Sequence, residues 1–243
     1  MDKSGYGNNG GFIGGATSSA KTAGKLGQGI RFTDPSHQVR IPDDADISPT
    51  TAGTVSAWVK DRITRTGGWQ VFVSKYDCLT DRDGYALVKQ PDNTFQFYLG
   101  GAAGADAAAT TISYTDLGWH HVVGTWNATS RDIYLDGVYA GTDNVDLQPV
   151  TYDGLDLTIG SCDSGYEYDG TVDDVRVYNR DLSAAEVAQL YKSGTSDLNA
   201  SVTKLQNGSS LATGLVGHWT FDNLDVTTRI TDRSGNGNHG GYI

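Results

Sequence analysis

Length, composition and charge bound what this chain can be. Its 243 residues, 37% of them hydrophobic and 10% aromatic, are enough to build one large all-β domain with an ordinary core. The 18 basic and 29 acidic side chains give a formal net charge of −11, which excludes a nucleic-acid partner because a phosphate backbone would be repelled. No apolar run approaches the roughly 18 residues that a membrane-spanning helix needs, so we expect no membrane span.

The two ends of the chain repeat each other. Residues 2–13, DKSGYGNNGGFI, match residues 232–243, DRSGNGNHGGYI, in order and at all but four positions. A chain that re-enters its own beginning is typical of slightly more than one period of a tandem array. We therefore predict one unit of a repeat protein, with a chance recurrence of a Gly/Asn-rich turn as the alternative.

Between the ends, apolar residues alternate in short runs separated by turn residues, which predicts a many-stranded antiparallel sandwich or barrel. The expected strands are residues 29–33, 38–42, 54–60, 70–75, 85–89, 94–99, 110–114, 120–126, 131–135, 138–142, 155–160, 170–178 and 214–222. One helix is expected over residues 184–192, because Ser183 and Glu186 form a capping box and Gly194 provides a stop.

Six runs, taken together, resemble the laminin G-like, concanavalin A-like jelly-roll modules. They are KLGQGIRF (25–32), VSAWVK (55–60), WHHVVGTW (119–126), IYLDG (133–137), LTIG (157–160) and GTVDDVRVYNR (170–180). The resemblance implies an all-β fold, an antiparallel concanavalin A-like jelly-roll sandwich with one short helix. It implies a laminin G-like sandwich over residues 1–192, a linker over 193–213, and a displaced first strand and loop of the repeat over 214–243.

The displacement of that strand has a structural consequence. In such modules a Gly-Leu-Val-x-x-Trp-x-Phe-Asp strand opens the domain, whereas here it stands at residues 214–222. A sandwich that lacks one strand leaves a hydrophobic slot and unpaired backbone groups. Residues 214–222 must therefore fold back into their own domain, as in a circular permutant, or enter a neighbouring molecule and link protomers. Effective concentration favours closure within one chain.

Asp173 is the first candidate for a metal ligand. It shares strand parity with Val175 and Val177, which directs its carboxylate to the core side, where an unpaired charge is costly. The concanavalin A-like families hold a structural Ca²⁺ near this strand, so the resemblance implies calcium here. The alternative is a carboxylate that accepts hydrogen bonds from nearby backbone N–H groups.

The repeated terminal loop supplies further candidate oxygens for calcium. They belong to Asp2, Asn8, Asp232 and Asn238. The alternative for this loop is a plain Gly/Asn turn with no metal.

Two acidic loops, residues 77–84 and 162–169, follow strands that lie close together in related folds. In the pentraxins, which are similar jelly rolls, loops at one edge carry calcium and ligand. The candidate metal ligands in these loops are Asp81, Asp83 and Asp163. The candidate ligand-binding residues are Tyr76, Asp81, Asp83, Asp163, Tyr166, Glu167 and Tyr168. Tyrosine rings at such an edge can stack on a sugar.

The two cysteines stand in these same loops. The proximity of the loops in related folds implies a disulfide between Cys78 and Cys162, which would join them. A bridge of this kind in an acidic, Gly-rich module favours an extracellular or cell-surface location.

Catalysis is not expected. Retaining glycosidases with this fold use two glutamates close together on one strand, whereas the two glutamates of this chain, Glu167 and Glu186, fall in a loop and in a helix cap. We therefore expect a non-catalytic, calcium-dependent adhesion module that binds a glycan or a surface protein. The alternative is a structural subunit that forms filaments, a homo-polymer linked through residues 214–243 by strand complementation.

Overall fold

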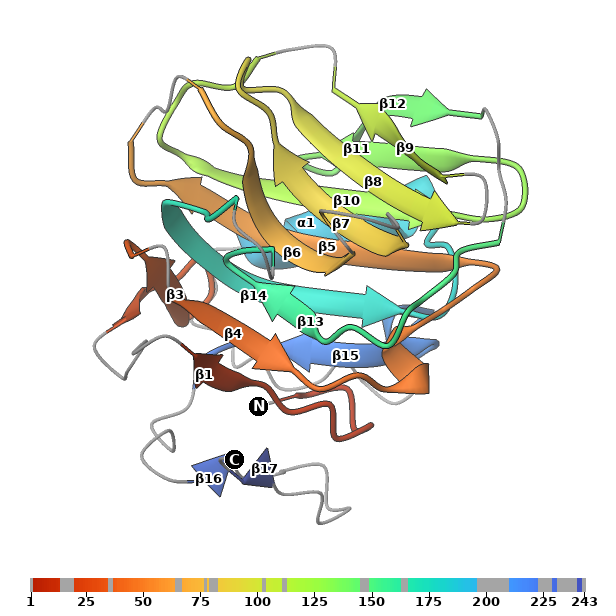
Figure 1. The fold of residues 1–243 in the computed structure, drawn as a ribbon. Helices are drawn as coiled ribbons and strands as arrows, with labels where there is room; N and C mark the ends of the chain where they lie inside the picture. Colours follow the sequence, from red (N-terminus) through yellow and green to blue (C-terminus); the bar gives the residue numbers. More distant parts are fainter. Residues whose placement is uncertain are drawn as a thin grey trace.

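The computed structural model describes most of the chain (Figure 1). The residues described are 2–13, 20–34, 37–63, 67–76, 78, 83–101, 104–110, 113–144, 149–162, 166–195, 210–222, 229–230 and 240–241.

Two antiparallel sheets form a sandwich. The seven-stranded sheet has the order β1 (Gly11–Ile13), β4 (Gln38–Ile41), β13 (Leu157–Ile159), β6 (Gln70–Tyr76), β7 (Gly84–Lys89), β8 (Phe95–Gly101), β9 (Gly104–Ala109). The eight-stranded sheet has the order β12 (Val138–Asp143), β11 (Arg131–Leu135), β10 (Trp119–Trp126), β5 (Gly53–Asp61), β14 (Gly170–Tyr178), β3 (Gln28–Phe32), β2 (Lys21–Ala23), and β15 (Leu215–Trp219) also pairs with β14. The predicted antiparallel jelly-roll sandwich is confirmed.

Three short elements and one helix complete the described chain. They are η2 (Ala45–Ile47), α1 (Ala184–Thr195), η3 (Ser210–Ala212), and the two-stranded sheet of β16 (Arg229–Ile230) with β17 (Gly240–Gly241). Figure 1 shows α1 behind the strands of the sandwich and β16 with β17 below them.

The alternation that predicts strands also fills the core between the sheets. Val55, Ala57 and Val59 of β5 are each no more than 1% exposed, because successive side chains of a strand point to opposite faces. The opposite sheet contributes Phe97, which lies directly against Gly124 of β10. A Cβ atom at Gly124 would be 2.3 Å from Cδ2 of Phe97, so only glycine allows the two sheets to approach this closely.

Strand β14 changes partner along its length. Its first residues, Gly170 to Val172, pair with β3, whereas Val175 to Tyr178 pair with β15. Residues of the displaced segment therefore close the sandwich of their own chain, and Trp219 is fully buried in the main core.

The linker predicted over residues 193–213 is not uniformly a surface segment, because Leu211 of η3 is buried in the cluster beneath α1. The division of the chain at these boundaries stays a prediction.

Two local predictions are wrong, and three short strands were not predicted. Residues 110, 113 and 114 lie outside any strand, and the edge strand is β9, whose Gly/Ala-rich sequence lacks the alternation that marks a strand. The short strands β1 and β2 also lack an alternating pattern of apolar residues. They form because they pair with β4 and β3. The helix does not stop at Gly194 but runs to Thr195. Gly194 serves close packing instead, since a Cβ atom there would be 2.6 Å from the Trp58 ring.

The start of α1 is as predicted. Glu186 accepts a hydrogen bond from the backbone N–H of Ser183 at 3.0 Å, and the N–H of Glu186 donates to the Ser183 hydroxyl at 3.4 Å. This reciprocal pair satisfies donors that a helix N-terminus leaves free. Arg180 adds an ion pair with Glu186 at 2.8 Å.

Helix α1 covers an aromatic cluster on the outer face of the eight-stranded sheet. The Tyr191 ring of the helix stacks on Trp58 with centroids 5.5 Å apart, and the His121 ring lies 5.0 Å from Trp58. Burial lowers the pKa of His121 to about 4. The charge of Asp174 opposes this shift and that of Arg176 adds to it. His121 is therefore neutral in the folded protein at pH 7.

We predict that His121 contributes to acid denaturation. Between about pH 6.5 and pH 4 the unfolded chain binds a proton at His121 and the folded chain does not, so stability falls as the pH falls through this window. The pKa difference corresponds to about 3 kcal/mol at most. Urea denaturation of the His121→Leu variant at pH 7 and pH 4 should show a smaller loss of stability than the wild type. An equal loss in both proteins would contradict the assignment.

Candidate functional site

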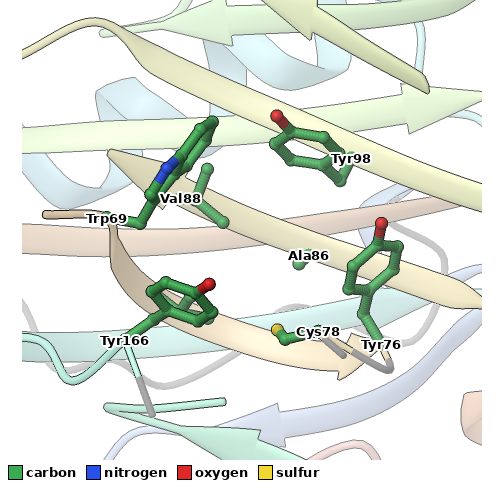
Figure 2. Close-up of a pocket in the computed structure, with 8 residues that line it drawn as sticks. Trp69, Tyr76, Cys78, Ala86, Val88, Tyr98 and Tyr166 are labelled. Atoms are coloured by element: carbon green, nitrogen blue, oxygen red, sulfur yellow. The ribbon is translucent and has the colours of Figure 1, made fainter. Parts of the chain in front are cut away.

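A groove lies on the outer face of the seven-stranded sheet, over β6, β7 and β8 (Figure 2). It has a volume of about 220 Å³ and is lined by Trp69, Val71, Tyr76, Cys78, Ala86, Val88, Tyr98 and Tyr166. Alternation creates it. Tyr85 and Leu87 of β7 are buried in the main core, so Ala86 and Val88 of the same strand point the other way.

The groove has an apolar floor and aromatic walls. Ala86 and Val88 form its buried floor, and Figure 2 shows the four aromatic rings arranged around them. Tyr98 meets Trp69 edge to face at 5.8 Å and lies 5.9 Å from the Tyr76 ring. None of the eight lining residues is charged, so the polar atoms at the walls are the indole N–H and the tyrosine hydroxyls.

Tyr166 closes the groove on one side from an unusual backbone position. Its φ of 61° lies in the left-handed region, which few non-glycine residues adopt. The backbone is held there by neighbouring strands, since the carbonyl of Tyr166 accepts a hydrogen bond from the N–H of Val71 at 2.9 Å. The side chain is 42% exposed, so a ligand in the groove can reach the ring.

The structure contains the predicted disulfide between Cys78 and Cys162. The two Cα atoms lie 6.4 Å apart although the residues are separated by 84 positions in the sequence. Cys162 is buried and Cys78 lines the groove. The bridge therefore joins the chain after β6 to the chain after β13 at the edge of the groove.

The predicted ligand-binding residues fall in different places. Tyr76 and Tyr166 line the groove. Glu167, the residue after Tyr166, is half-buried and does not line the groove. Tyr168 does not fit its predicted role, because it is 2% exposed and its hydroxyl donates to Asp61 at 3.0 Å in the core.

Of the acidic candidates in the two loops, Asp83 accepts a hydrogen bond from the hydroxyl of Thr151, and Asp81 and Asp163 lie outside the described residues. Trp69 and Tyr98 are the two aromatic groove residues that the sequence did not predict. The signal for Tyr98 was available, because it alternates with the core residues Phe97 and Leu99 of β8 and so points outward.

Asp173 lies where β14 passes from one partner strand to the other. It is fully buried, and its two carboxylate oxygens accept hydrogen bonds from the N–H groups of Leu26 at 2.8 Å and Asp174 at 2.7 Å. Burial raises the pKa of Asp173 to about 8, and the carboxylates of Asp174 and Asp222 add to the rise. The position is costly for an anion without a nearby cation.

Asp174 lies against an arginine and a histidine. The Arg176 guanidinium lies 3.0 Å from the Asp174 carboxylate, and Nε2 of His218 lies 2.6 Å from it. Burial alone would raise the pKa of Asp174, but the charges and hydrogen bonds of Arg176 and His218 together outweigh it and hold that pKa far below its usual range. Arg176 pairs with Asp174 as predicted, and no ion-pair partner of Asp173 lies among the described residues. The prediction that Asp173 faces the core with Val175 and Val177 is wrong, because the register against β5 shifts between Asp173 and Arg176 and Asp173 pairs with Trp58, whose ring lies on the outer face of the sheet.

A second carboxylate approaches the same turn as Asp173. Asp222 accepts a hydrogen bond from the N–H of Gln28 at 2.7 Å. Glycines make room for both acids: a Cβ atom at Gly24 would be 2.5 Å from Asp173 Oδ2, and one at Gly27 would be 2.0 Å from Asp222 Oδ1. Two carboxylates on a glycine-rich turn are a partial oxygen set for calcium, which takes six to eight oxygens and completes its shell with carbonyls and water.

The terminal-loop candidates Asp2 and Asn8 are engaged in a turn. The Asp2 carboxylate accepts from the N–H groups of Ser4 (2.8 Å), Gly7 (3.1 Å), Asn8 (3.2 Å) and His218 (2.6 Å) and from the Ser4 hydroxyl (2.6 Å). These contacts match the turn alternative. Asp232 and Asn238 lie outside the described residues. Within the described ranges, no three or more His, Cys, Asp or Glu side chains form a group that could hold a metal, so calcium stays a prediction.

Comparison with known proteins places the fold. Residues 33–188 match the laminin G-type family model described as the concanavalin A-like lectin/glucanases superfamily. No curated protein sequence gives a significant match. Among the α-helices in the described part of the chain, none is long and apolar enough to cross a bilayer.

Several solved structures are similar. The binding domain of Paraclostridial Mosquitocidal Protein 1 has a TM-score of 0.63 at 15% identity, covering 77% of this chain and 48% of that one. Domain 4 of a GH43 extracellular arabinanase from Geobacillus stearothermophilus, in complex with arabinotriose, has a TM-score of 0.56 at 18% identity, covering 70% and 80%. The binding domain of botulinum neurotoxin DC, in complex with rat synaptotagmin II, has a TM-score of 0.60 at 15% identity, covering 81% and 49%.

At these identities the structural likeness establishes the fold alone. The chain spans about half the length of the two toxin binding domains that it matches. The family model, by contrast, covers more than half of this chain. The chain therefore belongs to the concanavalin A-like lectin/glucanases superfamily.

Proposed function

We propose that this chain is a non-catalytic glycan-binding module whose ligand lies in the aromatic groove over β6, β7 and β8. The observation that carries the proposal is the composition of the groove: four aromatic rings surround a buried aliphatic floor, and none of the eight lining side chains is charged. The apolar face of a sugar ring stacks on such aromatic surfaces, while hydroxyl and indole N–H groups at the rim hydrogen-bond the sugar hydroxyls.

The dimensions and charge of the groove narrow the ligand class. Its volume of about 220 Å³ is below the roughly 300–1,000 Å³ typical of pockets that enclose a drug-sized ligand, which suits one ring or the end of a glycan chain. An acidic sugar would find no cationic side chain in the lining and would meet a chain with a net charge of −11. The ligand is therefore a neutral glycan.

The similar structures support the same class of function without establishing it. One of them is a domain in complex with arabinotriose, and another is a neurotoxin binding domain in complex with synaptotagmin, so a surface protein is the alternative partner. A sialidase also shares the fold. Against catalysis in this chain stands Glu186, whose carboxylate is engaged by Arg180 and the helix cap.

The disulfide supports a location outside the reducing cytosol, at the cell surface or in the extracellular space. The repeated ends of the sequence support a unit of a surface array that acts in adhesion.

Calcium enters the proposal at Asp173 and Asp222, with backbone oxygens of the turn between Gly24 and Gln28 to supplement them. A cation there would offset the burial of the Asp173 carboxylate. Asp173 belongs to the eight-stranded sheet, whereas the groove lies on the outer face of the seven-stranded sheet. Calcium in this position would act on the stability of the sandwich and not on the ligand directly.

We expect Trp69→Ala to weaken glycan binding at least tenfold, about 1.4 kcal/mol, because the substitution removes one wall of the groove. A glycan array would identify a neutral ligand, and calorimetry would then compare the wild type with this variant. Tyr139→Ala is the matched control, since Tyr139 is 53% exposed on the other sheet. Failure of the wild type to bind any glycan, or equal affinities in wild type and Trp69→Ala, would contradict the proposal.

Calcium should raise the melting temperature in a way that depends on Asp173. Free calcium at about 100 times the dissociation constant adds about 2.7 kcal/mol to the free energy of unfolding. This corresponds to a rise in melting temperature of roughly 5–10 °C for a chain of this size. The shift should be larger at pH 8 than at pH 6, because calcium must displace the proton that the raised pKa keeps on Asp173. Asp173→Asn should abolish it and Asp153→Asn, on an exposed loop, should not. A shift that survives in Asp173→Asn would refute this site.

A further inference from the structure

The N-terminal loop fills a slot formed by β15 and β4. On β15, the Asp2 carboxylate accepts the N–H of His218 at 2.6 Å, and the Asn8 side chain donates to the carbonyl of Val216 at 2.8 Å. The indole N–H of Trp219 donates to the carbonyl of Asn8 at 2.6 Å. On β4, residues 11–13 extend the sheet as strand β1. The loop thus covers the end of β15 and one edge of the seven-stranded sheet.

The positions that make these contacts are the ones that the two ends of the chain share. Asp2, Ser4, Gly7 and Asn8 correspond to an identical residue in 232–243. Gly10 is shared as well, and it fits only as glycine, because a Cβ atom there would be 2.8 Å from Val39 Cγ1. The side-chain hydrogen bonds of Asp2 and Asn8 to β15 both come from shared positions.

At the four positions where the copies differ, the contacts of the first copy do not require its particular side chains. Lys3 is exposed and bonds β15 only through its backbone N–H, and Tyr6 is 48% exposed. In the second copy a tyrosine stands at the position of Phe12, so the aromatic ring is kept. Asn9 donates to the Gly7 carbonyl and accepts from the Asp2 N–H, and the histidine at the matching position also offers one donor and one acceptor nitrogen.

The shared sequence already has two different pairings in this structure. Gly11 of the first copy pairs with Arg40 of β4, whereas Gly241, its counterpart, pairs with Arg229 in the small sheet of β16 and β17. The first copy therefore lies in the slot, whereas the two described residues of the second copy pair locally, although the residues that contact the slot are the same in both sequences.

We propose that residues 232–243 are an alternative occupant of this slot, so that either copy can cap β15 and pair with β4. The second copy is within reach, because the twelve residues between Trp219 and Asp232 span up to roughly 40 Å when extended. The copy that is left out of the slot is then free to fill the same slot in an adjacent unit of the array. The slot would thus connect neighbouring repeats of the proposed array, a role independent of the glycan-binding groove.

The full-length chain with substitutions at the paired aspartates tests this exchange. We expect Asp2→Ala and Asp232→Ala each to change the melting temperature by less than about 2 °C, because the intact copy takes the slot. The double variant should melt at least about 6 °C lower. Hydrogen exchange at the His218 amide gives a local readout: protection should persist in each single variant and fall at least about tenfold in the double variant.

Lys3→Ala and Arg233→Ala, alone and together, are the matched controls, because they change positions at which the copies differ; all three should behave as the wild type. If Asp2→Ala alone lost as much stability and His218 protection as the double variant, or failed to fold, the second copy would not replace the first and the proposal would be overturned. A double variant no less stable than either single variant would overturn it as well.

Discussion

The insertion of β15 beside β14 is the interaction on which the rest of the structure depends. Strand β14 lies at the centre of the eight-stranded sheet, between β5 on one side and, on the other, β3 followed by β15. Without β15, the backbone of residues 175–178 would lose its partner on the side away from β5, and the core would lose Trp219, which is fully buried. Unpaired strand edges and exposed aromatic surface favour association with other chains, so the closure of this gap also determines whether the module stands alone.

The change of partner along β14 explains why the buried acids lie where they do. Between Val172 and Val175 neither β3 nor β15 continues the ladder, and the register against β5 shifts between Asp173 and Arg176. Asp174 adopts a φ of 48° at this irregularity, which turns its carboxylate toward Arg176 and leaves Asp173 facing the glycine-rich turn. The same junction brings Asp222 close, because that residue follows β15. A metal candidate thus arises from the displaced strand itself.

The fold was predictable because the alternation of apolar residues and the turn residues are local features of the sequence. The groove was not predictable in this way. Alternation places Val55, Ala57 and Val59 in the core, and the ends of most strands follow from turn residues. The groove depends instead on which strands are neighbours: Trp69, Ala86 and Tyr98 meet only when β6, β7 and β8 pair, and no spacing in the sequence encodes that. Tyr166 and Tyr168 differ by two positions and both carry rings, yet one is in the groove and the other in the core, because the chain between them is irregular and the period-two rule does not apply.

Nuclear Overhauser measurements on a mixture of isotopically labelled and unlabelled chains test the closure of the sandwich most directly. Val175 faces Trp219 across the β14–β15 ladder, so protons of the two residues should show contacts within labelled chains. No such contacts should join a labelled chain to an unlabelled one. Contacts between Val175 of one chain and Trp219 of another, or none at all, would contradict the view that each molecule completes its own sandwich.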